Sequence, residues 1–277
     1  MAQGRTKSGY EFDSARLDRV ERRFWREIWD AVPVEVAAER GIERHAAGSV
    51  QATVVGALAE VSMMNLVLGA TEPGAVDHGY LEDALAWAEA RGASPYVPVS
   101  PGPEAAGAES VLAARGYRRG YGWMKFVRDA HPPRFRAPEV EVVELTGPDQ
   151  EPFGAIAATG FGLPAWGGDF FGHLPGRPGW RCYVARIGGE AQACAAILIE
   201  GDVAEFGIAA TLEPARGRGC QLALLHRRIA DAAAAGCTTL FVETGERTPA
   251  RPSTSYRNIL RAGFEEAYVR PNWVRAG

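Results

Sequence analysis

The residues whose types and spacing best suit chemistry form a short basic turn, Arg216-Gly217-Arg218-Gly219. A strand-like apolar run over 203–210 precedes this turn, and a helix-like run over 221–235 follows it. Glycines let a backbone approach a ligand closely, and the first N–H groups of a helix are free and carry partial positive charge. The arginines would add charge-assisted hydrogen bonds. The order therefore predicts an anion site, although the turn alone is also compatible with a helix start that bears two solvated arginines.

Two common phosphate loops do not fit this turn. A dinucleotide-binding fingerprint needs a third glycine, and a P-loop needs Gly-Lys-Ser/Thr, which does not follow here. A different nucleotide bound at the same helix start remains an open alternative.

The elements that must position the turn lie around it in the second half of the chain. Gly188-Gly189 and Gly201-Asp202 separate apolar runs and predict tight turns between antiparallel strands. The predicted strands cover 140–145, 183–187, 191–200, 203–210, 238–243 and 264–274, and the predicted helices cover 150–159, 221–235 and 255–261.

The first half of the chain predicts a related order of elements. Asp13 or Ser14 is expected to cap a helix with apolar residues at three- and four-residue steps. The predicted strands that follow cover 50–58, 63–68 and 96–99, and 117–127 is expected to be a strand or a bent hairpin. The predicted helices cover 80–91 and 104–115.

A proline-rich segment and an internal echo divide the chain. Three prolines break every periodicity between 128 and 138, which is typical of a stiff linker. Residues 114–121 and 261–268 resemble each other at an offset of 147: in each, a helix ends at glycine and an aromatic residue opens a strand. We therefore expect an α+β protein with tandem domains. The predicted boundaries are a loose tail over 1–12, a first domain over 13–128, a linker over 129–138 and a second domain over 139–277.

Composition restricts the class of protein. The chain of 277 residues is 47% hydrophobic and 23% charged, with a net charge of −4, which argues against nucleic acid as the main partner. No apolar run is long enough to span a membrane, and no signal peptide is predicted, so we expect a cytoplasmic protein without a membrane partner. Four cysteines without a CxxC pair predict reduced thiols, and the five histidines lack metal-ligand spacing, so no metal is expected.

At this point the sequence resembles the GCN5-related N-acetyltransferase (GNAT) family. The coenzyme loop of that family reads Arg/Gln-x-x-Gly-x-Gly/Ala, and residues 216–221 match it through Gly219, whereas Gln221 replaces the final small residue. A Val-x-Pro upstream is echoed by Leu212-Glu213-Pro214, and the family's late Gly-Phe by Gly263-Phe264. The resemblance covers roughly 139–277. It implies two GNAT-like domains, each a mixed, mostly antiparallel twisted sheet flanked by helices, of which the first has lost its coenzyme loop.

The resemblance implies acetyl-CoA, or another acyl-CoA, as co-substrate. The strand before the loop is expected to splay from its neighbour, and the acyl-pantetheine arm to lie in the opening. Residues expected to contact the coenzyme share the loop, the strand end before it or the penultimate helix; they are Ala210, Thr211, Leu212, Arg216, Gly217, Arg218, Gly219, Cys220, Gln221, Leu222, Ser255 and Asn258. For Ser255 a helix N-cap is an equal alternative, and for Cys220 a small packed residue is the alternative to a nucleophile.

The catalytic residues are less well marked. Glu205, on the strand before the loop, is the candidate general base, against the alternative of a solvent-facing strand carboxylate. The family's acid is a tyrosine at the position held here by Ile259. Tyr256 and Tyr268 are the candidate substitutes, against the alternative of packed aromatics. Trp166, Phe170 and Phe171 are expected to contact the acceptor, or else to belong to the core.

The predicted activity is acyl transfer from acyl-CoA to a primary amine by direct attack in a ternary complex. A small-molecule amine and a monomer or homodimer are expected. The alternative is a catalytically silent acyl-CoA sensor or scaffold. The missing tyrosine favours this alternative, and the intact loop argues only against a complete loss of coenzyme binding.

Overall fold

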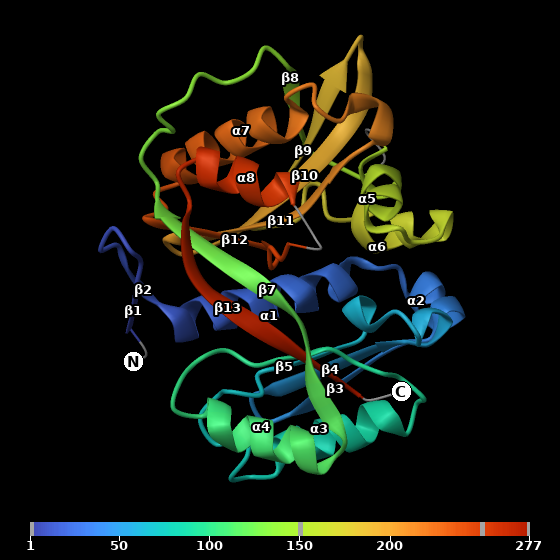
Figure 1. Cartoon of the computed structure of the whole chain (residues 1–277). Helices are drawn as coiled ribbons and strands as arrows, with labels where there is room; N and C mark the ends of the chain where they lie inside the picture. The colour runs from blue at the N-terminus through green and yellow to red at the C-terminus, as the bar shows by residue number, and fades with distance from the viewer. Residues whose placement is uncertain (1–2, 149–151, 250–252, 276–277) are drawn as a thin grey trace.

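The computed structural model describes residues 3–148, 152–249 and 253–275. Its fold is α+β, built on one large mixed sheet with helices on both faces (Figure 1). The strands are β1 (Gln3–Arg5), β2 (Glu11–Asp13), β3 (Ile42–Ala47), β4 (Val50–Val55), β5 (Leu66–Leu68), β6 (Val97–Pro98), β7 (Tyr117–Asp129), β8 (Glu141–Leu145), β9 (Trp180–Ile187), β10 (Glu190–Glu200), β11 (Val203–Thr211), β12 (Thr239–Gly245) and β13 (Glu265–Arg275). The α-helices are α1 (Ser14–Ala31), α2 (Val34–Arg40), α3 (Tyr80–Glu89), α4 (Ala105–Ala114), α5 (Phe153–Phe161), α6 (Asp169–Gly172), α7 (Cys220–Ala234) and α8 (Thr254–Arg261). Short 3-10 helices cover Gly56–Leu58, Ser62–Met64, Ala165–Gly168 and Glu213–Ala215.

The large sheet has eight strands in the order β6-β13-β7-β12-β11-β10-β9-β8. Only β11 and β12 pair in parallel, and the other neighbours are antiparallel. Both faces of its central strands are buried: on β10, Cys194 and Leu198 pack on one face, and Ala195 and Ile197 on the other. This follows from the two-residue period of a strand whose sheet is covered on both sides.

Each half of the chain places its last long strand beside a strand of the other half. The strand β7, from the first half, lies between β12 and β13, whereas β13, from the second half, lies between β7 and β6. In Figure 1, β7 and β13 run together from the upper part of the molecule into the lower part. The two halves therefore share one hydrogen-bonded sheet, which the order of elements along the chain did not predict.

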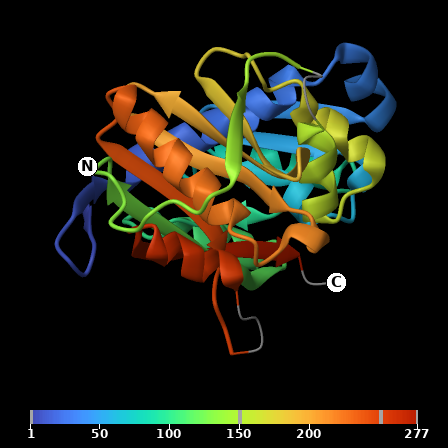
Figure 2. The same ribbon diagram turned by 90° about the horizontal axis from the view of Figure 1, so that it is seen from above.

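Helices cover the sheet in two groups. The helices α7 and α8 pack on one face of β9–β12, whereas α1, α5 and α6 pack on the other (Figures 1 and 2). The smaller sheet β3-β4-β5 lies below α1, and α3 and α4 pack beside it. Asp13 caps α1 by accepting from the Arg16 N–H at 3.1 Å, one of the two caps expected.

Several elements differ from the sequence-based expectation. Residues 3–13 form the hairpin β1–β2 instead of a loose tail, because Phe12 is buried and stacks on Tyr268; residues 1–2 of that tail lie outside the described residues. The helix α2 and the strand β3 were not predicted, since their sequences mix apolar and charged residues without a clear period. The helix expected over 150–159 is α5, and residues 150–151 lie outside the described ranges.

Candidate active site

The strands β11 and β12 separate before the chain reaches the basic turn. Their parallel pairing starts at Val203 opposite Thr239 and ends at Phe206 opposite Val242, although both strands continue beyond this point. The backbone groups of the unpaired ends thus face an opening instead of each other. This is the splayed strand that the family resemblance implied.

A bulge on β11 re-aims the strand at the same point. Pairing with β10 passes from Gly207 opposite Ala196 to Ala210 opposite Cys194, so two residues of β11 face one residue of β10. One of the two, Ile208, has a φ of 49° and is the only non-glycine residue with positive φ in the described ranges. A β-branched residue in this region is strained, and such strain clusters at functional sites.

A cavity of about 880 Å³, here called the larger cavity, lies between the end of β11, the start of α7 and α8. The predicted coenzyme residues line it with one exception, Leu212, whose N–H is donated to the Gln192 carbonyl at 2.9 Å. Gly219 precedes α7 with a φ of 89°, and no side chain caps the helix. The backbone ladder of α7 begins only at Ala223, which donates to Gly219, so the N–H groups of the first turn are free for a ligand.

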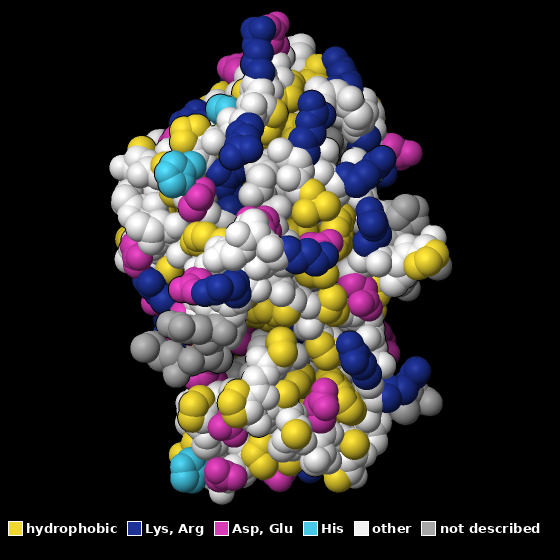
Figure 3. Space-filling view, turned by 60° about the vertical axis from the view of Figure 1, so that its left-hand side comes forward, with side chains coloured by type: hydrophobic (Ala, Val, Ile, Leu, Met, Phe, Trp, Pro, Cys, Tyr) yellow, Lys and Arg dark blue, Asp and Glu magenta, His cyan; other side chains and the backbone are white. Residues whose placement is uncertain are grey.

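The charge of the larger cavity is one-sided. Five arginines and no carboxylate line it among the described residues; the arginines are Arg216, Arg218, Arg228, Arg257 and Arg261. No ion pair joins Arg216 or Arg218 to another described residue. Figure 3 shows basic side chains gathered over the upper part of one face, which belongs to the second half of the chain. Free helix N–H groups and unpaired guanidinium groups make this cavity suited to a phosphorylated ligand.

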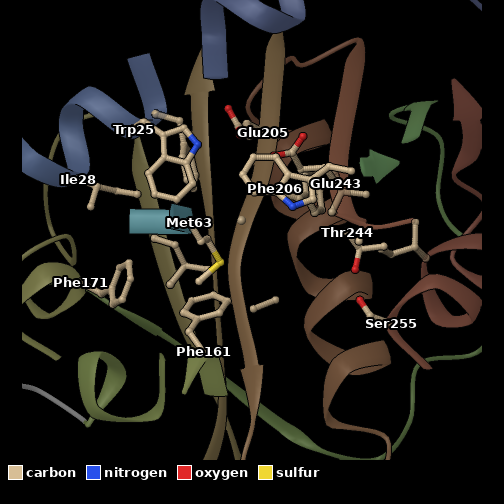
Figure 4. Close-up of a pocket in the computed structure, with 18 of the residues that line it drawn as sticks. Trp25, Ile28, Met63, Phe161, Phe171, Glu205, Phe206, Glu243, Thr244 and Ser255 are labelled. Atoms are coloured by element: carbon tan, nitrogen blue, oxygen red, sulfur yellow. The ribbon is translucent and has the colours of Figure 1, made fainter. Parts of the chain in front are cut away.

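A second cavity of about 250 Å³, here called the smaller cavity, lies on the other side of the bulge. Its walls come from both halves of the chain, and most of them are apolar (Figure 4). The first half contributes Phe24, Trp25, Ile28, Met63, Met64 and Trp123. The two cavities have four lining residues in common, namely Ala209, Gln221, Arg228 and Ser255, so they meet at one wall.

Two carboxylates line the smaller cavity, Glu205 on β11 and Glu243 on β12. Glu205 is only 4% exposed, so it is not the solvent-facing strand carboxylate of the alternative interpretation. Burial, reinforced by the Glu21 carboxylate, raises the pKa of Glu205 well above its ordinary value. Burial likewise raises the pKa of Glu243 to about 7, against the opposing effect of Arg270. Sequence reasoning missed Glu243, although its place two residues after Phe241 puts it on the face that Phe241 shares with Glu205.

Neither candidate acid tyrosine lines the two cavities. The Tyr256 hydroxyl donates to Glu266, and its ring packs edge-on against Phe126. The Tyr268 hydroxyl lies 3.3 Å from an Asp18 carboxylate oxygen. Both hydroxyls are thus engaged elsewhere, and the geometry gives no support for either as the proton donor. Ile259, at the family's tyrosine position, does line the smaller cavity.

The predicted acceptor contacts are only partly brought together. Phe171 lines the smaller cavity. Phe170 is fully buried and packs on Trp29, so it belongs to the core. Trp166 lies under the Arg40 guanidinium at 4.5 Å and lines neither cavity. The sequence pattern could not separate the three, since all are interleaved with glycines in one segment.

Ser255 and Asn258 both line the larger cavity and are tied to the loop through Gln221. The Gln221 amide donates to the Ser255 hydroxyl at 2.9 Å, and the Asn258 amide donates to the Gln221 carbonyl oxygen at 2.7 Å. The N-cap of α8 is Ser253 instead of Ser255, so the capping alternative for Ser255 is wrong. Cys220, which lines the same cavity, is buried like the other three free cysteines, and burial raises the pKa of its thiol.

Arg228 is a site residue that sequence reasoning missed. Its side chain is 1% exposed, donates to the carbonyls of Leu224 and Ala196, and lies 4.9 Å from the Phe206 ring. Burial lowers the pKa of Arg228 to about 10, so it stays charged at neutral pH. The signal was present, since this arginine stands among the apolar residues that form the buried face of α7.

Comparison with known families gives one match to a family model. Residues 153–245 match the acetyltransferase (GNAT) domain. This GNAT match runs from α5 to the end of β12 and includes β11, the basic turn and α7. It supports acyl transfer as the general activity and acetyl-CoA as the usual co-substrate of the family. The search of curated proteins gives no match.

Solved structures share this GNAT fold. A GCN5-related N-acetyltransferase from Kribbella flavida is 18% identical, with a TM-score of 0.54 over 85% of this chain and 90% of that one. A GNAT-family acetyltransferase from Colwellia psychrerythraea is 13% identical, with a TM-score of 0.53 over 96% and 98%. A tandem GNAT protein from the clavulanic acid biosynthesis pathway is 16% identical, with a TM-score of 0.50 over 81% and 77%. At these identities the similarity establishes the fold alone.

No group of three or more His, Cys, Asp or Glu side chains in the described ranges is arranged to hold a metal ion. Within the same ranges, no helix has the length and apolar character needed to cross a membrane.

Proposed function

We propose that this protein transfers an acetyl or short acyl group from acyl-CoA to a primary amine, by direct attack in a ternary complex. The observation that carries the proposal is the wall shared by the two cavities. An arginine-lined cavity suited to the coenzyme meets a cavity that holds buried carboxylates, and they meet where β11 leaves β12. The GNAT match over the same elements supports it.

In this proposal the larger cavity binds the coenzyme. The free N–H groups at the start of α7 bind the pyrophosphate, with Arg216 and Arg218 beside it. Ala210 and Thr211, on the unpaired end of β11, hold the pantetheine arm, and Ser255 and Asn258 contact it from α8. The thioester then lies at the shared wall, within reach of the smaller cavity.

The acceptor amine enters the smaller cavity as an ammonium ion and gives one proton to Glu205 or Glu243. A carboxylate with a pKa near 7, like that of Glu243, is well matched to this task at neutral pH. The amine nitrogen attacks the thioester carbon, the C–S bond breaks, and the products are an amide, the coenzyme thiol and one proton. Because a thiol has a pKa of roughly 8.5, a thiolate leaves readily and takes its proton from water. A dedicated tyrosine at position 259 is therefore dispensable.

We further propose that the chain is a tandem pair of GNAT-like domains, with boundaries near 128 and 139. The support is the repeated order of elements: a strand that leaves its parallel neighbour, a helix, and a last strand given to the other half. In the first half, Leu66 of β5 forms a parallel bridge with Tyr96, which directly precedes β6. In the second half, β11 and β12 pair in parallel and then separate. The first half then serves the acceptor cavity and has no coenzyme loop of its own.

The test is binding and turnover of acetyl-CoA by the full chain. We expect acetyl-CoA to raise the melting temperature and bind with micromolar affinity, and CoA thiol to be released when a suitable amine is present. Arg216→Ala is expected to weaken binding about tenfold, as the loss of one charge-assisted contact predicts. Arg118→Ala, an exposed arginine on β7, is the matched control and is expected to have no effect.

Two other outcomes of this test would contradict the proposal in different ways. Binding of acetyl-CoA without thiol release on any amine would favour the acyl-CoA sensor. Absence of binding, with Arg216→Ala unchanged from the parent protein, would overturn the coenzyme site itself.

A further inference from the structure

A buried cluster of charges behind the smaller cavity has more acids than bases. Two fully buried cations, Lys125 and Arg270, join α1 to β7 and β13. The carboxylates around them are Asp18, Glu21, Glu205 and Glu243. Lys125 lies 2.7 Å from Glu21, and Arg270 lies 3.0 Å from Glu243, so the cations are already engaged. With two cations for four carboxyl groups, full ionisation would leave this cluster short of positive charge.

Within this cluster, the shortage of positive charge is greatest at Glu205. Its Oε2 atom is buried and has no hydrogen-bond partner among the described residues. A buried carboxylate oxygen without a hydrogen-bond partner destabilises the protein, and a bound cation would offset that destabilisation. Glu205 lines the smaller cavity, so a cation bound at that end of the cavity would lie beside this carboxylate.

Glu243 lies beside Glu205 across the strand pair. Glu205 is opposite Phe241 in the parallel register, and Glu243 follows Phe241 by two residues on the same face. Both carboxylates therefore border one end of the smaller cavity, as Figure 4 shows. An ammonium group has three donors and fits between two such acceptors.

The rest of the smaller cavity is apolar and small. Trp25, Met63, Phe161 and Phe171 gather on the side away from Thr244 and Ser255 (Figure 4). Its volume of about 250 Å³ suits a small acceptor. The one cation in the lining, Arg228, already donates two of its groups to backbone carbonyls.

We infer that the acceptor is a small amine with a single positive charge, carried on an aromatic or branched aliphatic body without a carboxylate. Its ammonium group lies between Glu205 and Glu243, and its carbon body packs on Trp25, Phe161 and Phe171. This inference rests on the proposed function, because the reaction is the same amine attack with the proton passing to the carboxylate pair. A substrate carboxylate in this cavity would face two glutamates, and a second ammonium would be buried among aromatic rings.

The test compares three small amines that differ in their charged groups: 2-phenylethylamine, L-phenylalanine and 1,4-diaminobutane. We expect kcat/KM for 2-phenylethylamine to exceed that for the other two by about 100-fold, since like-charge contact and an unpaired buried charge are each strongly unfavourable. Calorimetry with CoA present is expected to detect binding of 2-phenylethylamine alone. Acetylation of L-phenylalanine or 1,4-diaminobutane as fast as 2-phenylethylamine would overturn the inference while the proposed function stands. Failure of acetyl-CoA itself to bind would instead overturn the proposed function.

Variants test the position of the ammonium group. Glu205→Gln and Glu243→Gln are each expected to weaken binding of 2-phenylethylamine at least tenfold and to leave CoA affinity within about twofold. Glu190→Gln, an exposed glutamate on the β9–β10 hairpin, is expected to change neither. Phe161→Ala tests the apolar wall, away from the charge cluster. It is expected to weaken binding of 2-phenylethylamine about tenfold and to leave binding of methylamine nearly unchanged. Unchanged amine binding in both glutamine variants, or equal losses for both amines in Phe161→Ala, would overturn the proposed binding mode.

Discussion

The side chain of Gln221 donates to the hydroxyl of Ser255 at 2.9 Å, and both residues border both cavities. Gln221 is the residue at which the basic turn departs from the GNAT pattern. It uses its extra length to tie the start of α7 to α8, where Asn258 donates to its carbonyl oxygen. The departure thus positions the shared wall of the cavities instead of obstructing it.

The first prediction is an energetic coupling between these two residues. Gln221→Ala removes two side-chain hydrogen bonds and is expected to lower the free energy of unfolding by about 1–2 kcal/mol. In a double-mutant cycle with Ser255→Ala, measured by urea denaturation, the coupling is expected to be at least about 0.5 kcal/mol. The exposed and remote Ser110→Ala is the comparison, and its effect should simply add to that of Gln221→Ala. Strict additivity with Ser255→Ala would contradict the tie.

The second prediction concerns the glycine that begins α7. Gly219 has a φ of 89°, and an added Cβ would lie 2.9 Å from Pro138 Cβ. Gly219→Ala is therefore expected to destabilise the fold by about 1–2 kcal/mol and to weaken acetyl-CoA binding more than tenfold, because the helix start must shift. Isothermal calorimetry and thermal unfolding measure the two effects.

Gly236 is the matched control for Gly219. It has a φ of 86°, yet an added Cβ would meet nothing within 4 Å, and it lines neither cavity. Gly236→Ala should show a similar backbone penalty with unchanged acetyl-CoA affinity. Equal losses of affinity in both variants would mean that the effect comes from general destabilisation.

The third prediction is a pH dependence of turnover that follows from Glu243. Burial raises the pKa of this carboxylate to about 7. Only the deprotonated form accepts a proton from the ammonium group, so kcat/KM is expected to rise with pH and to bend near 7. Below the bend, each unit of pH should lower the rate about tenfold. Glu243→Gln is expected to lose this bend, and an unchanged profile in the variant would assign the titration to another group.

The fourth prediction is that the buried ion cluster holds the two halves together. Although burial by itself would raise the pKa of Glu21, Arg270 and Lys125 hold it below its ordinary value. Glu21→Gln leaves both cations short of a carboxylate and is expected to destabilise the protein by about 3–5 kcal/mol in chemical denaturation. Because β7 and β13 each belong to the sheet of the other half, unfolding is expected to remain a single transition. Two separate transitions would show that the halves fold independently.

An exposed ion pair provides the control for Glu21. Arg136 and Glu139 lie 2.8 Å apart, and both side chains are more than four-fifths exposed. Glu139→Gln should change the free energy of unfolding by less than about 1 kcal/mol, because solvent screens such a pair. A comparable loss in the two variants would contradict the importance of burial.

Local pattern was enough to select residues that line the larger cavity together. Glycine, arginine and the start of a helix stand within a few residues of one another, so their joint geometry is set by short-range backbone rules. Glu205 was chosen for a similar reason, since it lies on the strand that leads into the loop. Tyr256 and Tyr268 were chosen by distance along the chain, and that measure says nothing about which way a hydroxyl points.

By itself, the sequence determined most of the elements, their order and the basic turn, because each depends on periodicity and on residues close together in the chain. Tertiary structure alone decided which side chains share the smaller cavity. The smaller cavity brings together Trp25 of α1, Met63 and Glu243, which are far apart in the chain. They meet because the two halves exchange β7 and β13 within one sheet. The exchange depends on long-range pairing and on the burial of Lys125, Arg270 and Glu21 between the halves, and no local pattern carries that information.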